Sequence, residues 1–254
     1  MEKKLKPIDF ISMFLRSFFI QTVWNFKGLL SVGICYALIP VAKRLYKSKS
    51  DYKKFMNRHL CFFNTHPYFS AYALGAIAKE EEEYVLKGIE VNEQIEKFKN
   101  ALIGPLGAVG DQLFWGAIKP AAILVGFTGA AIIPNYEFKL IFLVIFLILY
   151  NFPHLFTRSM GLVRGYRSGY EIYRLLKIEN FKYLNNIYRT IGAIAIGIFT
   201  GYFLTSAVSA DWLAGAVFIS SGIVAFFIRI WKKAVYWPVI IPILLTLLTG
   251  MIIP

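Results

Sequence analysis

Polar side chains stand beside a proline in the otherwise aromatic and apolar stretch 58–67. Asn64, Thr65 and His66 come directly before Pro67. A proline disfavours helical geometry at the residue before it, so a helix is expected to stop here and to leave backbone groups free. An amide, a hydroxyl and an imidazole at such a break are suited to hydrogen bonding with a polar ligand.

A second stretch combines glycines with an acid and an indole. Gly104, Gly107 and Gly110 lie close together and permit close backbone approach, so they predict a loop. Asp111 follows directly and is placed to cap the next helix. Trp115 stands four residues further on and shares a helix face with Asp111.

The chemistry of these groups favours a sugar over a nucleotide. The glycine stretch lacks the Gly-Lys-Ser/Thr ending of a P-loop and does not fit dinucleotide spacing. Carboxylates and amides bind vicinal hydroxyls, and an aromatic ring can cover the C–H face of a sugar. The simpler alternative, favoured by spacing alone, is that Asp111 only caps a helix and Trp115 only fills a core. Broken helices near the membrane midplane form many transporter sites, which favours the sugar hypothesis.

The composition indicates which elements must position these groups. Of 254 residues, 57% are apolar and 17% charged, yet the net charge is +13. A disordered or ordinary soluble chain is less apolar than this. A nucleic-acid-binding protein can be as basic, but it does not carry long apolar runs, so we expect positive loops beside membrane segments and no nucleic-acid partner. Cys35 and Cys61 are expected to be unpaired thiols rather than zinc ligands.

Several apolar runs approach the length that crosses a bilayer. The predicted fold class is therefore an all-α integral membrane protein with about five membrane-embedded helices, some of them broken or re-entrant. Basic flanks predict that 43–58 and 158–189 lie in the cytoplasm and Asp211 outside. These basic segments are expected to attract anionic lipid or, as the less favoured alternative, to dock a phosphate-carrying partner protein. The candidate runs are 28–42, 120–134, 138–156, 191–209, 212–230 and 238–253.

Two further segments have polar patterns of their own. Residues 8–26 are expected to form an amphipathic helix that either lies on the inner leaflet or packs within a complex. The acidic stretch 79–99 is expected to be a solvated helix in which Glu83 and Lys87 pair.

Short motifs along the chain, together with the two stretches described first, match the sequence pattern of a known protein family. Over nearly its whole length the chain resembles the IID components of the mannose/fructose/sorbose-type phosphotransferase-system permeases. The matching pieces are Phe14-Leu15-Arg16-Ser17 with Gln21, Trp24-Asn25-Phe26, the segment 40–46, Arg58-His59, Gly75 before Glu80-Glu81-Glu82, Phe114-Trp115, Pro120, and Gly165-Tyr166 with Gly169.

The resemblance implies one IID domain over 1–254, with N-terminal helices in 1–60, a core in 61–189 and C-terminal transmembrane helices in 190–254. It implies a multi-pass protein of the bacterial inner membrane that pairs with a IIC subunit. The pair would form a trimer of heterodimers that moves a hexose by an elevator-like displacement, while cytoplasmic IIA and IIB proteins pass the phosphate. Since the phosphorylated histidines of such systems belong to IIA and IIB, no catalytic residue, cofactor or metal is expected on this chain.

Two groups of residues are expected to serve this function. The first would bind the sugar: Gln21, Asn64, Thr65, His66, Asp111 and Trp115. The second would fix the fold or the partner interface: Arg16, Asn25, Arg58, Gly104, Gly107 and Gly110.

Two departures from the family pattern motivate alternatives. Gly107 and Ala108 are exchanged relative to the usual order, and Gln112 follows the acid in place of proline or serine. An extramembrane insert that many members carry is reduced to Ala210-Asp211. One alternative is therefore a non-transporting regulatory or sensor protein that keeps the scaffold. A membrane-bound enzyme acting on lipid is a second alternative.

Overall fold

A computed structural model describes residues 4–89 and 93–210, together with isolated positions between 212 and 227. Every regular element of this described part is helical, which confirms the predicted all-α class. The α-helices are α1 (Pro7–Ser17), α2 (Ser31–Leu45), α3 (Lys49–Leu60), α4 (Ser70–Lys87), α5 (Glu93–Gly110), α6 (Lys119–Ile132), α7 (Tyr136–Ser168) and α8 (Lys182–Ala210). A π-helical segment, η1 (Asp111–Ile118), joins α5 to α6, and two 3₁₀ segments, η2 (Gly169–Arg174) and η3 (Ile178–Phe181), lie between α7 and α8.

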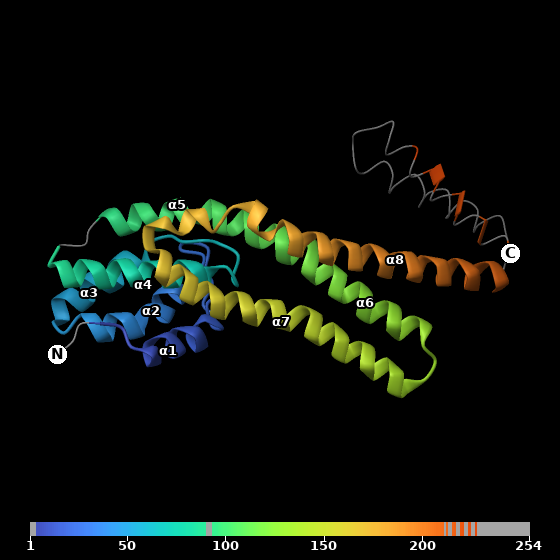
Figure 1. The fold of residues 1–254 in the computed structure, drawn as a ribbon, viewed down its shortest axis with the longest axis horizontal. Coiled ribbons are helices and arrows are strands. Elements are labelled where there is room, and N and C mark those ends of the chain that lie inside the picture. The colour runs from blue at the N-terminus through green and yellow to red at the C-terminus, as the bar shows by residue number, and fades with distance from the viewer. Residues whose placement is uncertain are drawn as a thin grey trace.

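The helices form a compact head and a projecting arm (Figure 1). The head contains α1 to α4, most of α5 and the C-terminal part of α7, with the main buried core among them. The arm consists of α6, the N-terminal part of α7, and α8, and within it α6 packs against both α7 and α8. Most large apolar side chains of the arm are exposed, as expected for a surface that faces lipid.

Three helical stretches are long and apolar enough to cross a membrane: Glu93–Ile132, Tyr136–Arg174 and Ile178–Ser206. They contain the predicted runs 120–134, 138–156 and 191–209 almost entirely. The run 28–42 instead falls mainly on α2, whose side chains are largely buried within the head. Apart from isolated positions, the runs 212–230 and 238–253 lie outside the described residues.

The predicted glycine loop is wrong, because the chain is helical without interruption from Glu93 to Ile132. Pro105 removes only one backbone donor from the ladder. Leu102, Leu106 and Val109 are buried against the core, and this packing outweighs the poor helix propensity of the glycines. Directly after Gly110 the chain continues as the π-helical segment η1, a feature often found at functional sites.

The predicted helix over 8–26 is also wrong in extent, because α1 ends at Ser17. Buried Arg158 of α7 donates hydrogen bonds to the Ser17 carbonyl at 2.6 Å and to its hydroxyl at 3.1 Å. This bond satisfies a carbonyl at the end of the helix, and a series of turns leads on to α2. Helix α1 packs against α2 of the same chain, while its outer face keeps Ile11 and Leu15 exposed, so the inner-leaflet and the complex alternatives both stay predictions.

The acidic stretch 79–99 is not one solvated helix. Helix α4 ends at Gly88, whose left-handed φ of 68° suits a glycine, and α5 begins at Glu93. The predicted pair of Glu83 and Lys87 is confirmed, with nitrogen and oxygen 2.8 Å apart. The triplet Glu80–Glu82 is buried, however, because it faces α2, α3 and α7 rather than water.

Candidate functional site

One surface pocket gathers all six residues predicted to bind sugar. It encloses about 650 Å³ and is open to the outside of this chain. Its walls come from the turns after α1, from the connection between α3 and α4, and from α5 with η1. The lining residues are Gln21, Trp24, Leu30, Asn64, Thr65, His66, Pro67, Ile103, Gly107, Asp111 and Trp115.

Backbone hydrogen bonds fix two of these walls to each other. The Leu30 amide donates to the Phe63 carbonyl at 2.9 Å, and the Phe63 amide donates to the Gly28 carbonyl at 3.3 Å. Helix α3 ends at Leu60 and α4 begins at Ser70, so Asn64, Thr65 and His66 lie on the short non-helical connection between them. The connection that carries these polar groups is therefore hydrogen-bonded to the segment before α2.

His66 is the most enclosed polar group of the pocket, with 1% of its surface exposed. Its ring stacks on Phe114, with centroids 5.1 Å apart and planes at 17°. Nδ1 accepts a hydrogen bond from the Tyr68 amide at 3.3 Å, so the proton of the neutral ring belongs on Nε2. Burial, helped by the nearby Arg158 charge, lowers the pKa of His66 to about 3 and keeps the ring neutral.

The floor of the pocket also contains polar atoms without a partner. His66 Nε2 and Thr65 Oγ1 are both buried and have no hydrogen-bond partner among the described residues. Leaving a buried donor or acceptor unsatisfied costs about 1–3 kcal/mol, so such atoms indicate a place where a ligand or water binds.

The opposite wall contributes a carboxylate and an aromatic face. Asp111 starts the π-helical turn and is exposed, and no side-chain cap is formed there, so the capping alternative is wrong. Trp115 is 41% exposed, so the alternative that it only fills the core is wrong as well. The Lys119 ammonium lies 4.5 Å from the centroid of the Trp115 ring.

Gly110 is the predicted glycine with the clearest role at this site. A Cβ added to Gly110 would come within 2.2 Å of the Cβ of His66, so only glycine lets η1 approach the imidazole. Gly104 and Gly107 would meet nothing within 4 Å. Gly110 is therefore needed to make room for His66, whereas Gly104 and Gly107 have free space around them.

Asn25 and Arg16, predicted to be structural or interface residues, both make contacts within the chain. The Asn25 side chain accepts a hydrogen bond from the Gly28 amide at 2.8 Å and shapes the turn before α2.

Arg16 binds a carbonyl that a proline leaves free. Pro40 lacks the amide that would normally bond to the Tyr36 carbonyl in α2. The Arg16 guanidinium donates to that carbonyl at 3.4 Å and lies over the Tyr36 ring.

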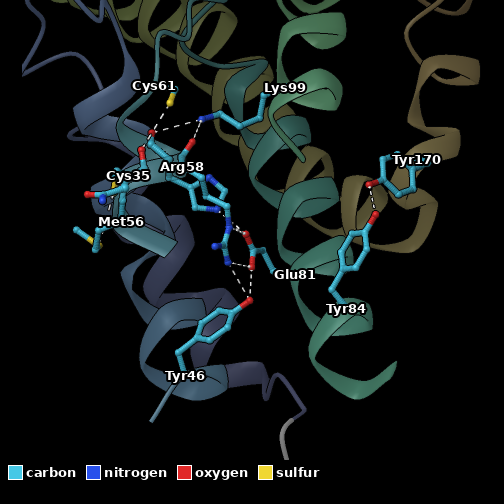
Figure 2. A network of polar contacts seen from close by, with 11 residues as sticks. Cys35, Tyr46, Met56, Arg58, Cys61, Glu81, Tyr84, Lys99 and Tyr170 are labelled. Atoms are coloured by element: carbon cyan, nitrogen blue, oxygen red, sulfur yellow. Dashed lines mark hydrogen bonds and ion pairs between the residues drawn. The ribbon is translucent and has the colours of Figure 1, made fainter. Parts of the chain in front are cut away.

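Arg58 belongs to a second polar cluster, which lies in the head away from the lined pocket (Figure 2). Its guanidinium donates to both oxygens of Glu81 at 2.6 and 2.7 Å and to the Tyr46 hydroxyl at 2.9 Å. His59 Nε2 lies 2.7 Å from Glu81 Oε1, and buried Lys99 donates to the Arg58 carbonyl at 2.9 Å. The cluster joins α2, α3, α4 and α5.

The electrostatics of this cluster favour a charged carboxylate beside a neutral imidazole. Burial opposes the charge of Glu81, but hydrogen bonds from Arg58 and His59 lower the pKa of this carboxyl to about 2. Burial likewise lowers the pKa of His59 to about 4, although its bond to Glu81 works in the opposite direction. His59 therefore serves as a neutral donor that helps to hold Glu81.

Sequence reasoning missed Glu81, Tyr46, Lys99 and Arg158 as polar groups inside the head. The available signal was the motif that contains Glu80–Glu82, since three consecutive acids on a helix cannot all be explained by pairing with Lys87 alone. Within the described residues, no group of three or more histidine, cysteine, aspartate or glutamate side chains is arranged to hold a metal ion.

Comparisons with known proteins agree with this architecture. The family model for the "PTS system mannose/fructose/sorbose family IID component" matches residues 4–253. The mannose-specific EIID component of Escherichia coli K12 is 36% identical over 200 residues, which are 78% of this chain and 67% of that protein. The fructose permease IID component of Bacillus subtilis 168 is 36% identical over 199 residues, or 78% of this chain and 68% of that protein.

A solved structure shows the same fold. It is a cryoEM structure of the mannose transporter ManYZ in complex with microcin E492, whose matched chain is 33% identical to this one. The match covers 77% of this chain and 70% of that chain, with a TM-score of 0.62. This chain thus spans about two thirds of the length of these relatives.

The family match extends over nearly the entire sequence, and these relatives are more than 30% identical to it. The chain therefore belongs to the mannose/fructose/sorbose family of phosphotransferase-system IID components.

Proposed function

We propose that this protein is the IID subunit of a phosphoenolpyruvate-dependent sugar permease that translocates a mannose-type hexose together with a IIC subunit. Phosphorylation of the sugar is then carried out by a IIB protein that receives its phosphate from IIA. Residues 1–254 act as one IID domain in the bacterial inner membrane, crossing it several times. The assembly is a trimer of IIC–IID heterodimers, as the family resemblance implies.

The observation that carries the proposal is the pocket with two unsatisfied polar atoms on its floor. His66 Nε2 offers a donor and Thr65 Oγ1 offers a hydroxyl, and both are buried without a partner in the part of the chain that the structure describes. The Asp111 carboxylate and the amides of Gln21 and Asn64 line the same pocket. These groups match the hydroxyls of a hexose, and the Trp115 ring offers a surface for its C–H face.

The pocket is open on this chain, which supports a sugar site that is shared with a second subunit. Asp111, Gln21 and Asn64 are exposed on this chain, so a ligand here would contact water unless another subunit covered it. Transport sites exclude water around their substrate while it is moved, and a IIC subunit is the partner that would close this one. Gly104 and Gly107 carry no side chain, and a Cβ at either would meet nothing within 4 Å, so the adjoining helix surface allows such a partner to approach closely.

Reconstituted transport tests the proposal. Vesicles containing this chain and its IIC partner, supplied with phosphorylated IIB, should take up and phosphorylate at least one hexose or hexosamine. The same vesicles without this chain serve as the control. Absence of uptake for every hexose and hexosamine tested, despite an assembled complex, would contradict the permease function and favour a regulatory protein.

A further inference from the structure

A second, larger groove lies between α1 and α2. Its empty volume is about 770 Å³, including space open to solvent, and it shares no lining residue with the sugar pocket. The two helices run in opposite directions, so the start of α1 lies beside the end of α2. The lining residues are Ile8, Asp9, Ser12, Arg16, Ile39, Pro40, Lys43 and Arg44.

The charges that line the groove leave an excess of positive charge. Asp9 accepts hydrogen bonds from the Lys6 amide at 2.8 Å and from Arg44 at 2.8 and 3.1 Å. Asp9 and Arg44 therefore compensate each other. The Lys43 ammonium is exposed and has no hydrogen bond or ion pair to any other described residue. Among the described residues, Arg16 hydrogen-bonds only to neutral groups, so this part of the chain leaves two positive charges of the groove uncompensated.

The guanidinium of Arg16 is held in place before any ligand arrives. It donates to the Ser12 hydroxyl at 3.3 Å and to the Tyr36 carbonyl at 3.4 Å, and it lies 4.5 Å from the centroid of the Tyr36 ring. The carbonyl is available because Pro40 cannot bond to it. An arginine fixed in this way loses little side-chain entropy when it binds an anion.

Apolar surface adjoins these charges. Ile8 is 60% exposed and forms one wall, while Ile39 and Pro40 form the other. Along the outer face of α1, Ile11 is 54% exposed and Leu15 is 57% exposed. An amphipathic helix with an exposed apolar face and adjacent basic groups is typical of a surface that lies at the boundary between headgroups and acyl chains.

We propose that this groove binds an anionic phospholipid of the phosphatidylglycerol type. The phosphodiester lies between Arg16 and Lys43, and the acyl chains follow Ile8, Ile11 and Leu15 along α1. The charge complementarity explains a preference over zwitterionic lipid, and basic pockets between helices are known to bind acidic headgroups. The apolar walls distinguish a lipid from a free phosphate ion, which gains nothing from them.

Native mass spectrometry of the purified full chain tests the proposal. Detergent-solubilised protein is titrated with phosphatidylglycerol and, separately, with phosphatidylcholine carrying the same acyl chains. Phosphatidylglycerol should bind more tightly, and Lys43→Gln should weaken its binding about fivefold, the effect of one basic residue near an anionic headgroup. The Lys43 side chain is exposed and makes no hydrogen bond or ion pair to another described residue, so the variant should fold normally. Lys49→Gln, which removes an exposed charge outside the groove, is the matched control.

Two outcomes would overturn the proposal. The first is equal phosphatidylglycerol affinity in the Lys43→Gln and Lys49→Gln variants, or equal affinity of the wild-type chain for the two lipids. The second is loss of the bound lipid when the IIC subunit is added, which would identify the groove as a subunit contact. Neither outcome bears on sugar transport, because the groove and the sugar pocket have no residue in common.

Discussion

Gly110 and His66 illustrate how single residues shape the candidate sugar site. The imidazole can stack on Phe114 only because position 110 has no side chain. The sequence marks both residues as unusual, since one belongs to a cluster of glycines and the other precedes a proline. Their contact across about forty residues of sequence is set by tertiary packing, which local patterns do not encode.

Substitution of Gly110 should separate sugar binding from folding. The added methyl group of Gly110→Ala would displace His66, so we expect hexose affinity of the IIC–IID complex to fall about tenfold or more, as for a lost buried hydrogen bond. Gly197→Ala in α8 is the matched control, because its Cβ would meet nothing within 4 Å and Gly197 does not line the sugar pocket. In that variant we expect unchanged affinity and a helix stabilised by up to about 1 kcal/mol. Equal affinities in the two variants would show that His66 does not depend on Gly110.

The pair of His59 and Glu81 should make stability depend on pH. In the folded chain the pKa of Glu81 is lowered to about 2, and that of His59 to about 4 from an ordinary value of 6.5. Both shifts mean that the unfolded chain binds more protons, so stability is full above pH 6.5 and declines as the pH falls. Each group contributes a slope of at most about 1.4 kcal/mol per pH unit.

Thermal unfolding of the purified protein measures this dependence. The melting temperature should fall as the pH is lowered from 6.5 toward 4, first because of His59 and then also because of Glu81. His59→Gln keeps a donor for Glu81 but does not titrate, so its profile should be flatter in the upper half of this range. A wild-type profile retained in the His59→Gln variant would rule out the predicted titration.

At the scale of helices, α4 and α7 are joined by close backbone approach. A Cβ at Gly75 would lie 2.1 Å from the Leu162 carbonyl, and one at Gly165 would lie 2.2 Å from the Tyr72 carbonyl. Small residues of this kind let helices in membrane proteins pack tightly. The sequence resemblance includes Gly75 and Gly165, but it does not reveal that they belong to the same contact.

Enlarging either glycine should force α4 and α7 apart. For Gly165→Ala we expect a loss of about 1–3 kcal/mol of stability, as for an overpacked core. Gly197→Ala in α8 is the control, since nothing lies within 4 Å of the added Cβ. A comparison of melting temperatures tests this. Equal values for both variants would mean that α4 and α7 do not pack closely at this point.

The errors of prediction at this scale share a physical cause. Glycine and proline lowered the expected helicity of 104–110, yet buried Leu102, Leu106 and Val109 keep the helix continuous. The acidic stretch looked solvated because Arg58, the partner of Glu81, is 23 residues away in sequence. Hydrophobic length, in contrast, is a local property, so the apolar runs of α6, α7 and α8 were identified correctly.

At the scale of the whole molecule, one end of the helical arm joins the head and the other end projects away from it (Figure 1). The turn between α6 and α7 and the end of α8 both lie at the end of the arm farthest from the head (Figure 1). The predicted cytoplasmic segments 43–58 and 158–189 lie mainly in or next to the head. Asp211, which is expected to lie outside the cell, falls outside the described residues. The same orientation can be tested at the turn between α6 and α7.

Cysteine labelling in whole cells tests the orientation. In a chain with Cys35 and Cys61 replaced by alanine, Tyr136→Cys should react with a membrane-impermeant maleimide from outside, because Tyr136 is 72% exposed at the start of α7. Lys53→Cys in α3 should react only after the cells are opened. The reverse pattern would invert the topology inferred from the basic segments.

Sugar binding by the assembled complex is the most direct test of the central claim that the pocket around His66 and Asp111 is the sugar site. Calorimetric titration of the IIC–IID complex with its hexose should show that Asp111→Asn weakens binding about tenfold or more, since a carboxylate that accepts hydroxyl bonds is lost. Asp51→Asn, at an exposed position in α3, should leave binding unchanged. Unchanged affinity in an intact Asp111→Asn complex would contradict the account.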